Sequence, residues 1–149
     1  MRLHRGFTLI ELMVTVAILA ILSGIAYPLY DSQSRKGKRP DGITALEKIA
    51  QAEQRYFSDN STFTITVTTL PGITSATSPG GYYTITVAAG ASGIASSFVV
   101  TATPVGNQAN DTCRSFSLSN TNVRSGTAVT STGTPVLLAA DARAICWGK

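Results

Sequence analysis

Residues with side chains suited to chemistry are scarce in this chain. It contains one histidine, His4, and two cysteines, Cys113 and Cys146. A lone histidine offers neither the usual nucleophile–base pair nor a histidine-based metal site, and no glycine-rich phosphate cradle follows a predicted strand. We therefore expect no enzyme activity, no catalytic residues, no metal and no cofactor.

The charge composition excludes or disfavours further classes of protein. Twelve Lys and Arg residues oppose eight Asp and Glu, a formal net charge of +4, and charged residues make up 13% of the 149 positions. That share is about half of the usual one. It excludes a solvated disordered chain and disfavours a strongly electrostatic nucleic-acid binder. The length is that of one domain.

The N-terminal segment predicts a membrane helix. Residues 1–6 are short and basic, and residues 7–30 are almost wholly apolar. Twenty-four residues give roughly 36 Å of helix, enough to cross a hydrocarbon core of ~30 Å. Three interpretations compete: a secretory signal cut after the small-x-small site at 24–26, a permanent anchor, or removal of the basic leader alone between Gly6 and Phe7.

Glu11 separates these interpretations. A carboxylate within an apolar helix costs roughly 2.5–3.5 kcal/mol at the bilayer centre, and a disposable signal gains nothing from it. Cleavage before Phe7 would create a cationic α-amino group. Between neighbouring chains shifted along their axes, that amine would pair well with Glu11. The alternative is that Glu11 snorkels to the nearer interface.

The segment Gly6-Phe7-Thr8-Leu9-Ile10-Glu11-Leu12 resembles the prepilin signature of type IV pilins and pseudopilins. The resemblance implies that a membrane-bound prepilin peptidase cleaves between Gly6 and Phe7 on the cytoplasmic side and N-methylates Phe7. It also implies that Glu11 meets the N-terminus of an adjacent subunit during filament assembly. Basic residues are denser at 35–39 than in the leader, which by the positive-inside rule alone favours the opposite orientation. The prepilin signal requires a cytoplasmic leader.

The resemblance also implies a location and partners. The chain would be a single-pass protein of the bacterial inner membrane with its N-terminus in the cytoplasm, and then part of an extracellular pilus. Its partners would be other pilin subunits, the inner membrane before assembly, the prepilin peptidase and the pilus assembly machinery.

Two features bear on the continuity of the N-terminal helix. Gly24 and Pro28 lie within the apolar stretch, where proline removes a hydrogen bond and bends a helix. Similar pilins lose helicity here once packed in a filament, so residues 20–28 are candidates for that segment. The second feature is the run Gly37, Pro40 and Gly42. The family has one long curved helix there, which these residues would kink or interrupt.

The remaining chain predicts an α+β head over residues 31–149. Apolar residues at helical spacing predict an amphipathic helix over 43–58, with Glu53 among the residues assigned to its polar sides. A connecting loop follows over 58–80. Period-two alternation predicts an antiparallel sheet over 81–120, with strands at 82–88, 98–103 and 114–119 and a fourth strand within 122–140. One helix laid across a small antiparallel sheet is an α+β head. The resemblance implies that this is the pilin fold, in which a long N-terminal helix, half in the membrane and half on the head, packs against the sheet, with a C-terminal disulfide-bracketed loop.

In the oxidising space beyond a membrane, Cys113 and Cys146 are expected to form a disulfide. Closing the loop 113–146 stabilises a head by roughly 3–4 kcal/mol in the chain-entropy model. A redox role would need closely spaced cysteines, so we expect a structural bond. The C-terminal half, with FVVTATP at 98–104 and Cys146-Trp147, resembles type IVa, PilE-like minor pilins. This favours a minor structural subunit that supports pilus assembly and pilus-dependent adhesion, twitching motility or DNA uptake.

Two alternatives remain. A DNA-binding competence pilin would use Arg114, Arg124 and Arg143, while the basic cluster at 35–39 would more readily meet lipid headgroups or a neighbour's carboxylates. A type II secretion pseudopilin would use a calcium site, for which Asp111 and Asp141 are thin support; these acids otherwise end turns.

Overall fold

The computed structural model describes residues 7–130, 133–136 and 139–148. It divides into two compact units, residues 1–34 and residues 35–149.

The first unit consists of the greater part of helix α1, Leu9–Gly37. No residue of α1 is buried. The Thr8 hydroxyl accepts a hydrogen bond from the Glu11 N–H at 3.3 Å, which caps the first turn, and the acidic Glu11 suits the positive end of the helix dipole. Among the described residues, one helical stretch is long and apolar enough to cross a membrane, and it begins with α1.

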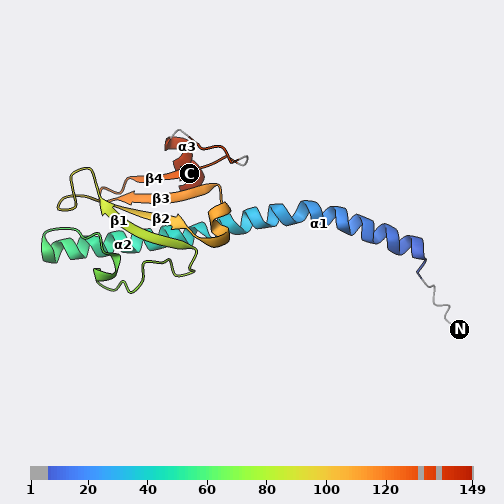
Figure 1. The fold of residues 1–149 in the computed structure, drawn as a ribbon, viewed down its shortest axis with the longest axis horizontal. Coiled ribbons are helices and arrows are strands. Elements are labelled where there is room, and N and C mark those ends of the chain that lie inside the picture. The colour runs from blue at the N-terminus through green and yellow to red at the C-terminus, as the bar shows by residue number, and fades with distance from the viewer. Residues whose placement is uncertain (1–6, 131–132, 137–138, 149) are drawn as a thin grey trace. The chain divides into compact units, whose positions relative to one another are not determined.

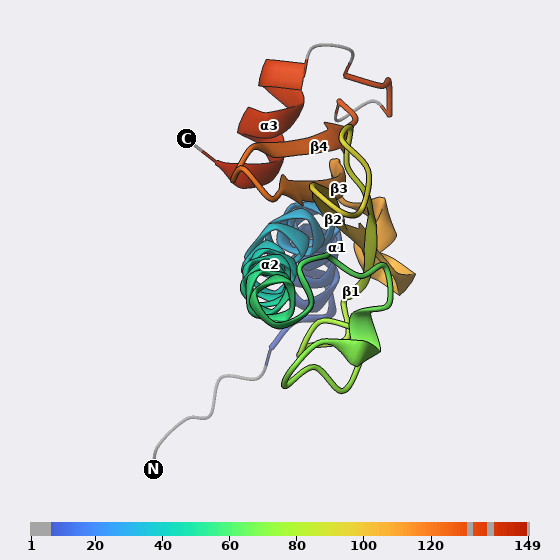
Figure 2. The ribbon, with the colours of Figure 1, turned by 90° about the vertical axis from the view of Figure 1, so that its left-hand side faces the viewer.

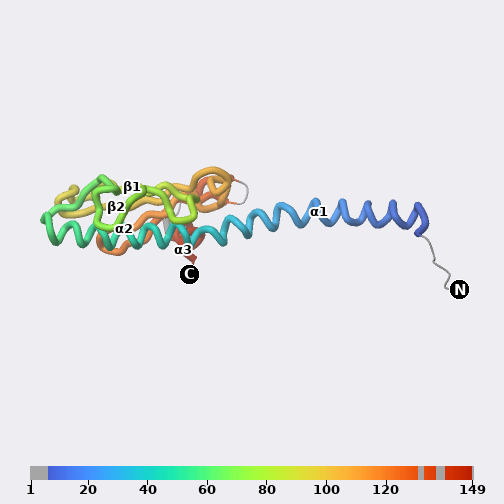
Figure 3. The backbone as a smooth tube through the Cα atoms, turned by 90° about the horizontal axis from the view of Figure 1, so that it is seen from below, coloured from blue at the N-terminus to red at the C-terminus, as the bar shows by residue number. Residues whose placement is uncertain are grey.

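Pro28 does not end α1. The helix runs through both Gly24 and Pro28, and the tube in Figure 3 coils continuously along α1. Proline lacks the N–H that would bond the carbonyl of Gly24, so this turn holds one hydrogen bond fewer. Loss of helicity over 20–28 in a filament stays a prediction.

Helix α2, Arg39–Asn60, begins one residue after α1 ends, and Lys38 forms the turn between them. The sequence prediction started this helix at residue 43, four residues too late. Pro40 is tolerated because the first turn of a helix needs no N–H donor there. Gly42 is needed, since a Cβ at this position would come within 2.9 Å of the Tyr83 ring.

Four strands follow α2, with an antiparallel order of β1-β2-β3-β4. They are β1 Tyr83–Ala89, β2 Phe98–Pro104, β3 Cys113–Ser119 and β4 Arg124–Ala128. Tyr83 pairs with Pro104, and Ile85 pairs with Ala102. The predicted meander is confirmed, and its fourth strand is the short β4.

The core of the head lies between α2 and the sheet (Figures 1 and 2). Leu46 and Ile49 of α2 pack there with Tyr83, Phe98 and Phe116 of the sheet, all at most 3% exposed. The alternation of buried and exposed residues along β1 is the one that the sequence predicted. The α+β pilin fold is therefore confirmed.

A further helix, α3 Ala139–Trp147, lies beside β4 (Figure 2). The sequence predicted no helix here. Nine residues give too few turns for a clear amphipathic pattern, and isolated helices of this length are unstable in water. Tertiary contacts with β4 and β3 therefore hold α3 in place.

Candidate functional site

The processing and assembly residues lie at the start of the chain. Gly6 falls outside the described residues, whereas the Phe7 side chain is 77% exposed. Glu11 is exposed in the first turn of α1 and is the only charged residue between 7 and 30. Among the described residues its carboxylate has no cationic partner. Cleavage after Gly6, methylation of Phe7 and pairing of Glu11 stay predictions.

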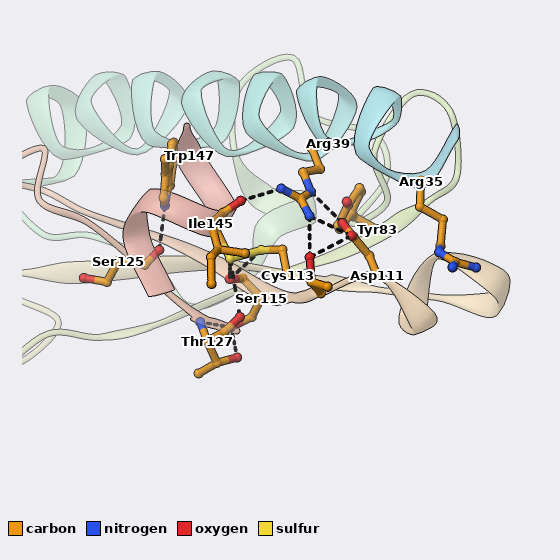
Figure 4. Close-up of a disulfide and its surroundings, with 12 residues drawn as sticks. Arg35, Arg39, Tyr83, Asp111, Cys113, Ser115, Ser125, Thr127, Ile145 and Trp147 are labelled. Atoms are coloured by element: carbon orange, nitrogen blue, oxygen red, sulfur yellow. Dashed lines mark hydrogen bonds and ion pairs between the residues drawn. A yellow bond between two sulfur atoms is a disulfide. The ribbon is translucent and has the colours of Figure 1, made fainter. Parts of the chain in front are cut away.

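The head contains a buried ion pair at the start of α2 (Figure 4). The Arg39 guanidinium holds the Asp111 carboxylate through two hydrogen bonds, Nε to Oδ2 at 2.6 Å and Nη2 to Oδ1 at 2.7 Å. The two side chains are 13% and 3% exposed. Arg39 Nη2 also donates to the Thr112 hydroxyl at 2.9 Å, and Nη1 donates to the Ile145 carbonyl. One arginine therefore joins α2, the start of β3 and α3.

The Gln108 side chain makes a second set of hydrogen bonds next to this ion pair. The Gln108 amide donates to the Arg35 carbonyl and to the Tyr83 hydroxyl, each at 2.9 Å. The pKa of Tyr83 is raised to about 12, mainly by burial; the nearby Asp111 charge contributes to the rise, whereas the Gln108 hydrogen bond and the Arg39 charge oppose it. Tyr83 therefore remains a neutral hydroxyl across the physiological pH range.

These contacts correct two predictions from the sequence. Arg39 was grouped with the basic residues 35–39 that would face lipid headgroups or a neighbouring subunit, yet its charge is neutralised inside the head. The calcium site for which Asp111 was thin support is not favoured, because both of its carboxylate oxygens bind Arg39, although Asp111 does end a turn, as predicted, directly after Gly106–Asn110. Seventy-two positions separate the partners, so no local pattern could indicate the pair.

The disulfide joins β3 to α3. Cys113 and Cys146 are bonded, with their Cα atoms 5.1 Å apart and exposures of 0% and 2%. Gly126 of β4 permits the close approach of β3 beside the bond, because a Cβ there would meet the Ser115 carbonyl oxygen at 2.4 Å, whereas its 3.4 Å distance to the Cys146 sulfur would be an ordinary contact. A shift in strand register lies between Cys113 and Ser115. The predicted disulfide is thus present.

The structure separates the three arginines proposed for DNA. Arg124 and Arg143 line one hollow together with Trp147 of α3, and the Arg124 guanidinium lies 5.0 Å from the Trp147 ring centroid. Arg114 lies at the other end of β3 from Leu118, the residue that pairs with Arg124, and it donates to the Ala109 carbonyl. Arg124 also contacts Glu47 at 3.3 Å, an exposed ion pair of small energetic weight.

Glu53 is a buried acid that the sequence prediction placed on a polar side of its helix. It is 0% exposed, and its Oε2 accepts the Thr64 N–H at 3.1 Å, while Oε1 has no partner among the described residues. Burial raises its pKa, although the Thr64 hydrogen bond opposes the shift. Its spacing was the available signal, since Glu53 follows Leu46 and Ile49 on one helical face.

An apolar N-terminal helix followed by a helix packed on an antiparallel sheet, with a disulfide near the C-terminus, is the architecture of a type IV pilin. Residues 1–27 match the prokaryotic N-terminal methylation motif. Residues 28–117, which are 90 of the 149 residues, match the family described as type IV minor pilin ComP, DNA uptake sequence receptor. The chain belongs to this family.

Curated relatives include pilins and a secretion protein. The chain is 38% identical over 60 residues to the type IV major pilin protein PilA of Myxococcus xanthus, covering 40% of this chain and 27% of that protein. It is 32% identical over 81 residues to a fimbrial protein of Neisseria meningitidis, covering 54% and 47%. It is 33% identical over 78 residues to type II secretion system core protein G of Klebsiella pneumoniae, covering 52% and 56%. In each case the alignment spans little more than half of the relative, or less.

One solved structure bears on the fold. The non-core minor pilin PilV of Neisseria meningitidis matches with a TM-score of 0.51 and 19% identity, covering 69% of this chain and 96% of that one. At this identity the likeness supports the fold alone.

Proposed function

We propose that this chain is a structural, non-enzymatic minor subunit of a type IV pilus. The observation that carries the proposal is α1, a helix with no buried residue, whose apolar part contains the single charge Glu11. An exposed apolar surface of this size needs lipid or other helices to cover it. A contact between different surfaces of identical or related subunits, repeated along a helix, builds a fibre.

The proposed processing and assembly of the chain take place in two stages. Before assembly, α1 anchors the chain once in the inner membrane, with the leader in the cytoplasm and the head outside. The prepilin peptidase then cuts between Gly6 and Phe7 and methylates the Phe7 amine, which remains cationic. In the second stage, Glu11 pairs with that amine on a neighbouring subunit as the chain enters the pilus.

Mass spectrometry of the protein sheared from cells tests the processing steps. The expected mature chain lacks residues 1–6, carries one methyl group on Phe7 and has two hydrogens fewer for the bond between Cys113 and Cys146. A mature N-terminus at Tyr27 would instead identify the segment as a secretory signal. Retention of residues 1–6 in surface pili would also contradict the proposal.

A second candidate function is binding of duplex DNA. The family description names a DNA uptake sequence receptor, and Arg124, Arg143 and Trp147 line one hollow of this head. Arginines of this kind bind phosphate groups, and the affinity then falls as salt rises. The mature chain would carry 10 basic and 8 acidic residues, 12 basic minus Arg2 and Arg5, so its side-chain charge of +2 gives little attraction outside this hollow.

Titration of the purified full chain with duplex DNA at several salt concentrations tests this candidate. Arg124→Ala and Arg143→Ala should each weaken binding and lower the slope of log affinity against log salt by about 1. Arg114→Ala, whose side chain lies away from the hollow, is the matched control. An equal loss in all three variants, or no salt dependence in the wild type, would contradict this assignment.

A further inference from the structure

Arg39 contacts the residue that precedes each cysteine. Its Nη2 donates to the Thr112 hydroxyl at 2.9 Å, and Thr112 precedes Cys113. Its Nη1 donates to the Ile145 carbonyl, and Ile145 precedes Cys146. Figure 4 shows the guanidinium between these two segments, on the helix side of the disulfide. One side chain therefore holds both flanks of the bond.

None of these contacts involves a sulfur atom. The guanidinium is fixed by the Asp111 carboxylate, which is 3% exposed, and the Thr112 carbonyl accepts the Val129 N–H at 2.8 Å. Trp147 adds a further attachment, since its indole N–H donates to the Ser125 carbonyl at 2.7 Å. All of these donors and acceptors are present when Cys113 and Cys146 are still thiols.

Holding two reacting groups in place greatly raises their effective concentration. A flexible segment of this length brings its ends together at roughly millimolar effective concentration, whereas well-oriented groups in a folded structure reach far higher values. The short helix α3 cannot provide this order alone. A contact that docks α3 before the bond forms would therefore favour oxidation of this pair.

We propose that Arg39, fixed by Asp111, is a positioning residue for the oxidation of Cys113 and Cys146. It docks the Ile145 end of α3 against the start of β3, so that the two thiols meet before they are joined. The disulfide then secures an arrangement that the arginine has already made. This role concerns maturation of the head and does not depend on the pilus function.

The reaction needs an oxidant that itself carries a disulfide. The thiolate of one cysteine attacks a sulfur of that disulfide, which forms a mixed disulfide and releases one thiolate. The thiolate of the second cysteine then attacks the mixed disulfide and releases the other. The protein loses two electrons and two protons, and the oxidant becomes two thiols. Arg39 takes no part in these bonds and only sets the distance between the two cysteines.

The first test measures the thiol–disulfide equilibrium of the full chain in detergent micelles. Reduced protein is equilibrated with glutathione and glutathione disulfide at several ratios, then alkylated and weighed by mass spectrometry. Arg39→Met should lower the equilibrium constant for bond formation at least about tenfold, because it releases α3 and leaves Asp111 unpaired. Arg39→Lys, which keeps the charge but lacks the fork of donors, should lie between Arg39→Met and wild type.

Arg55→Met is the matched control, since Arg55 is an exposed arginine of the same helix. Its equilibrium constant should stay within twofold of the wild-type value. An Arg39→Met constant within twofold of wild type would overturn the proposal. So would equal losses in the Arg39 and Arg55 variants.

A second test keeps the proposal falsifiable if Arg39→Met loses its fold. In the Cys113→Ala/Cys146→Ala chain, the amides of α3 should stay protected from hydrogen exchange, and the fluorescence of Trp147, the only tryptophan, should stay native. Adding Arg39→Met to this chain should remove both signals. Loss of both signals in the cysteine-free chain with Arg39 intact would show that the disulfide creates the docking, and would refute the proposal.

Discussion

The two units of this chain differ in whether a charge in apolar surroundings has an oppositely charged partner. In the head, the Arg39 and Asp111 charges are both nearly buried, and each is neutralised by the other. In the N-terminal unit, Glu11 is the only charge of an apolar stretch and has no cationic partner among the described residues. A buried charge whose partner lies in the same chain is neutralised there, and removing either partner leaves the other unpaired. A charge without such a partner needs one from outside the chain.

The largest expected effect concerns the charge pair of the head. Arg39→Met should lower the free energy of unfolding by about 3–5 kcal/mol, because it leaves the Asp111 carboxylate buried and unpaired. Urea unfolding of the full chain in micelles, followed by Trp147 fluorescence, measures the change. Adding Asp111→Leu should recover part of the loss. A loss below about 1 kcal/mol in Arg39→Met would show that the pair is not a main support of the head.

Two helical glycines, one in each unit, differ in how closely other residues pack against them. Gly42→Ala should destabilise the head by about 1–3 kcal/mol, since the new Cβ would lie 2.9 Å from the Tyr83 ring. Gly24→Ala meets no atom within 4 Å and should leave the same unfolding curve unchanged while raising helix content slightly. Equal effects of the two substitutions on the head would contradict this difference between the units.

Glu53 gives a pH dependence with a defined sign. The pKa of Glu53 in the folded state lies above its unfolded value near 4.5. The contribution of the protonated carboxyl to stability is therefore fully present below the unfolded pKa and is lost as pH rises through the folded pKa. At neutral pH, Glu53→Gln should therefore be more stable than wild type by about 1 kcal/mol, and its stability should fall less between pH 4 and 7. Thermal unfolding at several pH values measures this. An unchanged pH profile would show that Glu53 does not titrate in this environment.

The sequence predicted those parts of the molecule that depend on local periodicity. The apolar run of α1, the stripe of α2 and the alternation in β1 each follow from side chains a few positions apart. The features that it missed depend on residues far apart in the chain. Arg39 and Asp111 become neighbours only when the segment just before β3 folds against the start of α2, and α3 is too short to have a clear pattern.

The candidate site shows the same division. The processing signature around Phe7 and Glu11 lies within a few consecutive residues, so the sequence alone predicts it. The three arginines were chosen by charge alone, and the structure places Arg124 and Arg143 at one hollow while Arg114 lies elsewhere. Charge type is visible in a sequence, but the register between β3 and β4 decides which charges share a surface.

The central claim is that Glu11 has its partner on another subunit, and entry into pili tests it most directly. Glu11→Ala and the matched control Thr15→Ala, one helical turn further on, would be expressed in cells and measured in membranes and in sheared pili. Glu11→Ala should be processed normally, keep the wild-type stability of the head and be depleted from pili, while Thr15→Ala enters them normally. Incorporation of Glu11→Ala at the wild-type level would contradict the account.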